Sequence, residues 1–170
     1  MLKIKEIAVF GILGGLLYAQ KALLAAIPNV HLGAVMIAAM TLVYRRKALY
    51  PIAVYVLLEG LFGGFTIWWI PYLYVWVILW GAVMLLPSGW ESRRYGFLVY
   101  MLVCGMHGLL FGTLCAPPQA IGMGLDFRGL TDWILAGLPF DAIHGLSNFC
   151  LAILVLPLTR LLRKLQKTVL

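Results

Sequence analysis

Charged side chains are scarce in this sequence, and their scarcity excludes a water-soluble domain. Of the 170 residues, 11% are Asp, Glu, Lys or Arg, whereas 64% are hydrophobic. The surface of a soluble domain needs a charged fraction of roughly 25–35%. Acidic residues are the rarest, six against thirteen Lys and Arg, which leaves a net charge of +7. The chain is therefore expected to lie in a membrane.

Cysteine is also sparse, and several catalytic motifs are missing. Cys104, Cys115 and Cys150 have no metal-type spacing, so we interpret them as small apolar side chains. No phosphate-binding glycine loop followed by Lys and Ser or Thr occurs, so the chain has no ATPase motif of its own. HExxH and GxSxG are missing too, which disfavours the commoner intramembrane hydrolases. We expect neither an enzyme nor a bound cofactor or metal.

The cations that are present fall into four clusters separated by apolar runs. Eleven of the 13 Lys and Arg residues lie at positions 3–5, 45–47, 93–94 and 160–167. Cytoplasmic loops collect Lys and Arg, and a helix needs about 20 residues to cross a bilayer. The pattern predicts one all-α domain over residues 1–170, a bundle of six transmembrane helices with both termini in the cytoplasm. These helices are expected at residues 7–27, 30–44, 48–64, 70–86, 96–115 and 139–162.

The same pattern bears on partners and location. The clusters suit the anionic headgroups of a lipid bilayer, so nucleic acid is not expected as a partner. We expect a multi-pass protein of a prokaryotic plasma membrane. Residues 116–138 are predicted to form a long outer connection, because Pro117 and Pro118 end the fifth helix and the sixth begins at Pro139. This connection could be a lid or an ordinary solvated loop.

Polar side chains within the predicted spans gather in the outer half of the membrane. A charge in hydrocarbon costs several kcal/mol, so such residues mark functional sites or buried networks. Asp141, His144 and Asn148 are spaced i, i+3 and i+7, which places them on one helical face. A ligand cavity open to the outside and a network that joins the helices both remain possible. The residues come from four helices: Gln20, Lys21, Glu59, His107, Asp141, His144 and Asn148.

Aromatic residues are concentrated at the start of the fourth predicted helix. An interfacial belt needs about one or two aromatic side chains at each helix end, and this stretch supplies five. The surplus suits the wall of a pocket for a flat ring. The five are Trp68, Trp69, Tyr72, Tyr74 and Trp76.

Two ladders of small residues predict close helix contacts. Gly11, Gly15 and Ala19 repeat every four residues in the first helix, and Gly108 and Gly112 do so in the fifth. Such ladders let another helix approach closely. One ladder could serve internal packing and the other a partner protein.

Together these features resemble the substrate-binding S components of energy-coupling factor (ECF) transporters. Three stretches look like those of S components, residues 27–32 (IPNVHL), 56–61 (VLLEGL) and 138–149 (LPFDAIHGLSNF). The resemblance implies high-affinity uptake of a vitamin or similar ring-containing micronutrient. It also implies docking, through Gly11, Gly15 and Ala19, onto a transmembrane coupling protein bound to two ABC-type ATPases. By position it points to His31, Trp69, Tyr72, Tyr74, Trp76, His107, Asp141, His144 and Asn148 as ligand-binding residues, and Glu59 joins them from its predicted depth.

Three alternatives start from the histidines. His107 and His144 could be the axial ligands of a b-type haem. His31, His107 and His144 could bind nickel or cobalt in a metal-ion S component. Asp141, His144 and Ser147 could form a nucleophile set, but Ser147 lies on the same helix as His144 and is poorly placed for it.

Overall fold

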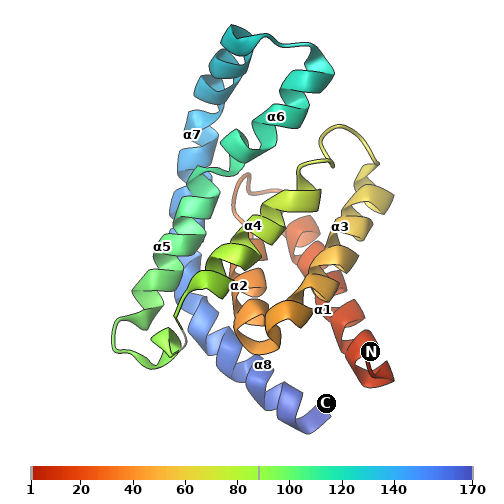
Figure 1. Ribbon diagram of the computed structural model, residues 1–170, viewed down its shortest axis with the longest axis vertical. Coiled ribbons are helices and arrows are strands. Elements are labelled where there is room, and N and C mark those ends of the chain that lie inside the picture. The colour runs from red at the N-terminus through yellow and green to blue at the C-terminus, as the bar shows by residue number, and fades with distance from the viewer. Residues whose placement is uncertain (1, 88, 170) are drawn as a thin grey trace.

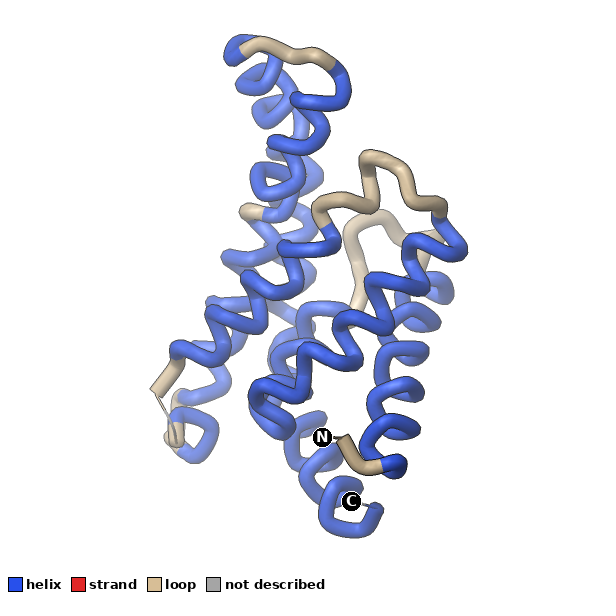
Figure 2. Tube along the Cα trace, turned by 45° about the vertical axis from the view of Figure 1, so that its right-hand side comes forward, coloured by secondary structure: helices blue, strands red, loops and turns tan. Residues whose placement is uncertain are grey.

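The computed structural model describes residues 2–87 and 89–169, and the regular elements in these ranges are all helical (Figures 1 and 2). Short 3₁₀ segments at Arg45–Ala48, Trp90–Ser92 and Ala152–Leu154 join or extend the longer helices. These are α1 (Ile4–Leu23), α2 (Gly33–Tyr44), α3 (Leu49–Gly63), α4 (Tyr72–Leu85), α5 (Gly96–Leu109), α6 (Phe111–Met123), α7 (Phe127–Leu151) and α8 (Val155–Val169).

Among the described residues, three helical stretches are long and apolar enough to cross a membrane. They are Ile4–Leu23, Gly96–Met123 and Phe127–Val169, and α4 is a shorter apolar helix. The all-α class is confirmed. Six spans with both termini inside the cell stay a prediction.

The short helix α2 lies at the centre of the bundle. Ten of its twelve residues are buried, mainly by α4 and α8. A helix that is apolar all round is stable where protein covers every face, and the many Ala residues of α2 let its neighbours approach. On either side of this centre, α1 packs against α3 and α5 packs antiparallel to α7.

The first four predicted helices agree with α1–α4 to within four residues at each end. The long connection expected at residues 116–138 is wrong. The chain forms most of α6 and the first half of α7 there, a helical hairpin that stands above the rest of the bundle in Figure 1. The sixth helix thus begins at Phe127, where the Asp126 carboxylate caps it by accepting the Gly129 N–H at 2.7 Å.

A tertiary hydrogen bond explains why the double proline does not end the helix. Pro118 has no N–H to donate to the carbonyl of Leu114, one turn earlier. The Tyr74 hydroxyl of α4 donates to that carbonyl instead, at 2.5 Å. The freed backbone group is therefore satisfied from a neighbouring helix, and α6 continues through Pro117 and Pro118 to Gly124, which ends it with a φ of +64°.

Candidate functional site

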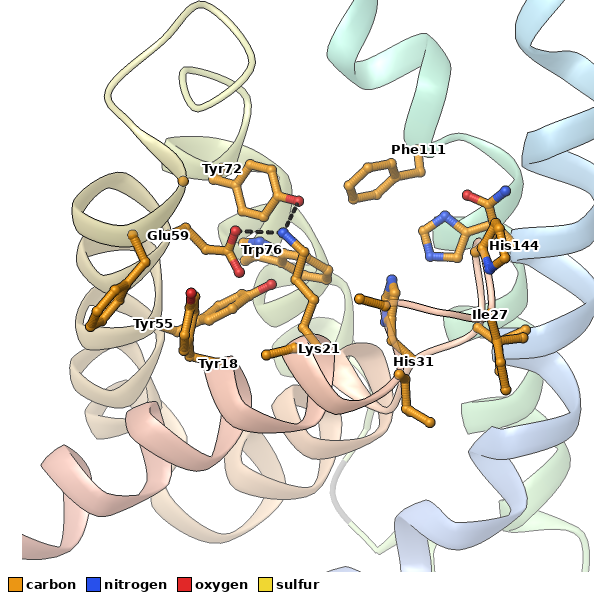
Figure 3. A pocket seen from close by; sticks show the side chains of 18 residues that line it. Tyr18, Lys21, Ile27, His31, Tyr55, Glu59, Tyr72, Trp76, Phe111 and His144 are labelled. Carbon is orange, nitrogen blue, oxygen red and sulfur yellow. Dashed lines mark hydrogen bonds and ion pairs between the residues drawn. The ribbon is translucent and has the colours of Figure 1, made fainter.

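The main candidate site is a cavity of about 410 Å³, which we call the central chamber. It lies at the end of α1 that is remote from the N-terminus, between the 24–32 loop, the end of α3, the start of α4 and the α5–α7 pair (Figure 3). Its volume is in the range of small-molecule sites. Its principal side chains are Tyr18, Lys21, His31, Tyr55, Glu59, Tyr72, Trp76, Phe111 and His144.

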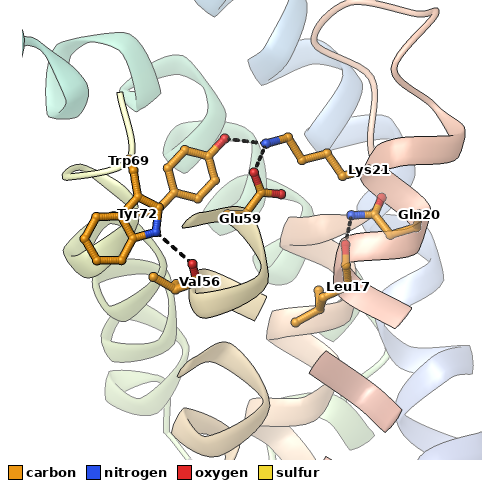
Figure 4. A network of polar contacts seen from close by, with 7 residues as sticks. All are labelled: Leu17, Gln20, Lys21, Val56, Glu59, Trp69 and Tyr72. Carbon is orange, nitrogen blue, oxygen red and sulfur yellow. Dashed lines mark hydrogen bonds and ion pairs between the residues drawn. The ribbon is translucent and has the colours of Figure 1, made fainter. Parts of the chain in front are cut away.

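A polar cluster forms one wall of the central chamber and joins three helices. The Lys21 ammonium of α1 donates to Glu59 of α3 in an ion pair and to the Tyr72 hydroxyl of α4 at 2.9 Å (Figure 4). Lys21 Nζ also lies 4.7 Å from the centroid of the Tyr72 ring. Because Glu59 is 9% exposed, this pairing compensates a carboxylate that would otherwise be costly to bury.

Rings form the opposite wall and the floor. Trp76 is 1% exposed, and its ring centroid lies 5.7 Å from those of Tyr55 and Phe111. The rings of His31 and His144 meet edge to face at 4.8 Å, and Phe111 packs on His144 at the same distance. These residues come from five segments of the chain, so a flat ligand would meet apolar faces on several sides.

The loop that carries His31 is fixed by two polar contacts. Gln20 of α1 accepts the Leu32 N–H at 2.7 Å through its side-chain oxygen. His31 Nδ1 accepts the Gly33 N–H at 3.3 Å. Burial, together with the positive charge of Lys21, lowers the pKa of His31 to about 4. The imidazole is therefore neutral at pH 7, and with Nδ1 acting as the acceptor its proton lies on Nε2.

Two smaller chambers adjoin the central one. An outer chamber of about 380 Å³ is reached past Asn29, Tyr72 and Phe111. Its remaining walls are Trp68, Pro71, Gly112, Cys115, Trp133, Gly137, Phe140 and Asp141. A side chamber of about 210 Å³ shares Lys21, Glu59 and Tyr72 with the central one and also reaches Trp69. Tyr72 lines all three chambers.

Four buried polar atoms on these walls have no hydrogen-bond partner among the described residues. They are Glu59 Oε1, Trp76 Nε1, His144 Nε2 and Asp141 Oδ2. Buried polar groups in native proteins are rarely left unpaired. The residues that line the chambers therefore include two carboxylates, an indole and an imidazole with unused hydrogen-bonding capacity.

The structure brings together most of the sequence-predicted site residues. His31, Glu59, Tyr72, Trp76 and His144 line the central chamber. Asp141 lines the outer chamber. Trp69 lines the side chamber, although its indole N–H donates to the Val56 carbonyl at 2.8 Å.

Three predicted site residues line none of these chambers. Tyr74 supports α6 through its hydroxyl. His107 Nε2 lies 2.9 Å from the Val75 carbonyl oxygen, and its ring packs behind Trp76. Asn148 is fully buried, and Gly108 makes room for it. These three therefore lie outside the chambers described, and a role for them in ligand binding stays a prediction.

Sequence reasoning missed several lining residues, notably Tyr18, Tyr55 and Phe111. Helical spacing would have found all three. Tyr18 lies three residues before Lys21 and Tyr55 lies four before Glu59. Phe111 lies four residues after His107, so each shares a face with a residue already singled out.

The histidine alternatives find little support in this geometry. The described part of the chain holds no group of three or more His, Cys, Asp or Glu side chains placed to bind a metal. His107 is bonded to backbone and lies outside the chambers, which disfavours a haem between His107 and His144.

The two small-residue ladders have different surroundings. A Cβ at Gly108 would lie 2.8 Å from both Asn148 Nδ2 and the His144 carbonyl oxygen, and one at Gly112 would lie 2.5 Å from Asp141 Oδ2. This ladder packs α5 and α6 against α7. A Cβ at Gly11 or Gly15 would meet nothing within 4 Å, and Ala19 is exposed. The α1 ladder is therefore an open face.

Comparison with known proteins adds no family assignment. No family model, curated protein or solved structure matches this chain. The fold and the site define an all-helical chain with membrane-length apolar helices and a cavity of mixed polar and aromatic character.

Proposed function

We propose that this chain is the membrane-embedded binding subunit of an uptake system, which captures a vitamin or similar small ring-containing micronutrient from outside the cell. One observation carries the proposal. Glu59, Trp76 and His144 line one cavity whose other walls are aromatic, and each carries a buried polar atom without a partner among the described residues. Apolar walls with a few convergent polar groups are typical of small-molecule sites.

The proposed topology has six spans with both termini in the cytoplasm. Its support is the distribution of charge along the bundle. The two termini and the α2–α3 and α4–α5 turns, which carry the four cation clusters, lie at one end in Figure 1. The cavity lies toward the other end, where an extracellular ligand would arrive. At twelve residues α2 is shorter than a lipid-exposed span, but protein surrounds it, and non-ideal spans are tolerated in that setting.

The proposed system includes a transmembrane coupling protein and two ABC-type ATPases, since the chain has no ATPase motif of its own. The open ladder of Gly11, Gly15 and Ala19 is the proposed docking face. Its support is that these positions leave room for the backbone of another helix at the surface of α1. In this proposal the protein is a multi-pass component of a prokaryotic plasma membrane.

The test is to identify small molecules released from the purified protein. The protein is extracted in mild detergent and denatured, and the supernatant is analysed by mass spectrometry and absorbance. We expect one ring-containing compound at near one-to-one stoichiometry. Ala22→Trp should abolish its retention because Ala22 lines the central chamber.

The matched control is Ala8→Trp, a change of the same size at an exposed position on the same helix, away from the chambers. It should retain the compound. A compound retained equally by both variants would not occupy the central chamber, and that result would count against the proposal. A haem spectrum would replace it with the redox alternative.

A further inference from the structure

We propose that the outer chamber binds an organic cation, so that the captured molecule carries an alkylammonium group or a cationic heterocycle. This inference rests on the proposed function and specifies its substrate class. It follows from the aromatic lining of that chamber and from the single carboxylate that faces it.

Five aromatic side chains surround the outer chamber. They come from the α3–α4 loop, α4, α6 and α7: Trp68, Tyr72, Phe111, Trp133 and Phe140. Trp68 and Trp133 lie with ring centroids 6.3 Å apart and planes inclined by 34°, although they are distant in sequence. Tyr72 and Phe111 line both the central and the outer chamber, and Figure 3 shows their rings on opposite sides of the pocket. Several aromatic faces around one space attract a cation through their quadrupoles, and such cages recognise alkylated ammonium groups.

Asp141 supplies the negative charge. It is 6% exposed, and its Oδ1 accepts the Gly112 N–H at 2.9 Å. Because α6 begins at Phe111, this carboxylate lies at a helix N-terminus, where the backbone dipole favours an ionised acid. Its second oxygen, Oδ2, is buried and unpartnered among the described residues.

No cation lies among the described residues that line the outer chamber. Lys21 borders the other two chambers and is already paired with Glu59. An anionic group placed beside Asp141 would be repelled. A neutral ring would leave the Asp141 charge balanced only by the Gly112 N–H and the start of α6. A cation satisfies both the carboxylate and the surrounding ring faces.

The test compares two probes of nearly identical shape. Choline carries a trimethylammonium group, and its uncharged tert-butyl analogue has carbon in place of the nitrogen. Each is titrated by calorimetry into purified protein that mass spectrometry has shown to be free of small molecules. We expect choline to bind at least about tenfold more tightly, the preference expected of about 1.4 kcal/mol of cation–π and charge attraction.

Asp141→Asn should remove most of that preference. The amide oxygen can still accept the Gly112 N–H, so the start of α6 is retained. Asp132→Asn is the matched control, an identical change at an exposed position on the same helix, and it should leave the preference intact. Trp133→Leu is the second test variant and should weaken choline binding without replacing the carboxylate.

Equal binding of the two probes, or no binding of choline to the wild-type protein, overturns the cation assignment. So does a preference that survives both Asp141→Asn and Trp133→Leu. The proposed capture function fails separately. It is rejected when the purified protein releases no compound whose retention is lost in Ala22→Trp. Release of an uncharged compound rejects only the assignment of a cationic ligand.

Discussion

Two adjacent glycines of α1 provide a direct test of how this helix is packed. A Cβ at Gly14 would lie 2.5 Å from Val54 Cβ and 2.8 Å from the Pro51 carbonyl oxygen, both of α3. A Cβ at Gly15 would meet nothing within 4 Å. The same substitution, Gly→Ala, is therefore expected to change stability in opposite directions at neighbouring positions.

The magnitudes follow from two competing effects. Replacing a glycine within a helix by alanine stabilises the helix by about 0.5–1 kcal/mol, because glycine loses more backbone freedom on folding. Forcing an extra methyl group into a packed contact costs about 1–3 kcal/mol. Gly14 faces a backbone carbonyl that cannot rotate away, so the cost should be at the upper end. We expect a net loss of about 1–2 kcal/mol for Gly14→Ala and a small gain for Gly15→Ala.

The assay is the free energy of unfolding, measured by titration with a denaturing detergent and followed by tryptophan fluorescence. Gly11→Ala is the control, because its added methyl group also meets open space. It should behave like Gly15→Ala. Equal stability of the Gly14 and Gly15 variants would refute the reasoning, since it would mean that α1 does not contact α3 through Gly14.

Four further predictions concern single contacts. Gly15→Leu should abolish co-purification with the proposed coupling and ATPase subunits while retention of the proposed ligand stays normal. Loss of both together would contradict the assignment of the docking face. Lys21→Met should destabilise the protein by about 1–3 kcal/mol, because Glu59 loses its ammonium partner. Adding Glu59→Gln to this variant should restore much of the lost stability. If the destabilisations caused by the two substitutions simply add, the ion pair does not contribute. Burial lowers the pKa of His31 to about 4, below the roughly 6.5 of a histidine in an unfolded chain. Between these two pKa values the unfolded state binds more protons than the folded state. The stability of the protein should therefore fall as the pH drops from about 6.5 towards about 4. His31→Gln should reduce this fall, as measured by melting temperatures between about pH 7 and about pH 5. Tyr74→Phe should cost about 1–3 kcal/mol, because the part-buried Leu114 carbonyl of the double-proline turn loses its donor. Proteolysis of α6 should reveal local opening.

The helices of the first half of the chain could be predicted from sequence because their ends are encoded locally. Gly64, in the left-handed region at a φ of +88°, ends α3, and cation clusters or prolines stand at the other boundaries. The α6–α7 hairpin could not be predicted in this way. The double proline is a local signal to stop, and the hydroxyl that overrides it comes from Tyr74, 40 residues earlier in the chain.

The sequence predicted that polar residues from several helices meet, but not their positions around each helix. These residues do converge, and His31, Glu59 and His144 line one chamber. Trp76 forms the floor, and it separates the central chamber from His107. Asn148 lies one turn deeper on α7 than His144 and is fully buried. No single-sequence pattern shows where such a floor lies, because a side chain from another helix forms it.

The two glycine ladders show why a pattern of small residues predicts proximity without naming the neighbour. Helix α7 packs against Gly108 and Gly112. A methyl group at Gly108 would clash with Asn148, and one at Gly112 would clash with Asp141. Gly11 and Gly15 meet no neighbour, although they lie on the helix that also brings Lys21 into the cavity. A protein bound to the open ladder would therefore contact the same rigid element that holds the ammonium of the polar cluster. In the proposed uptake system, this continuity along α1 gives the partner and the ligand a common structural element, which the internal ladder on α5 and α6 cannot provide.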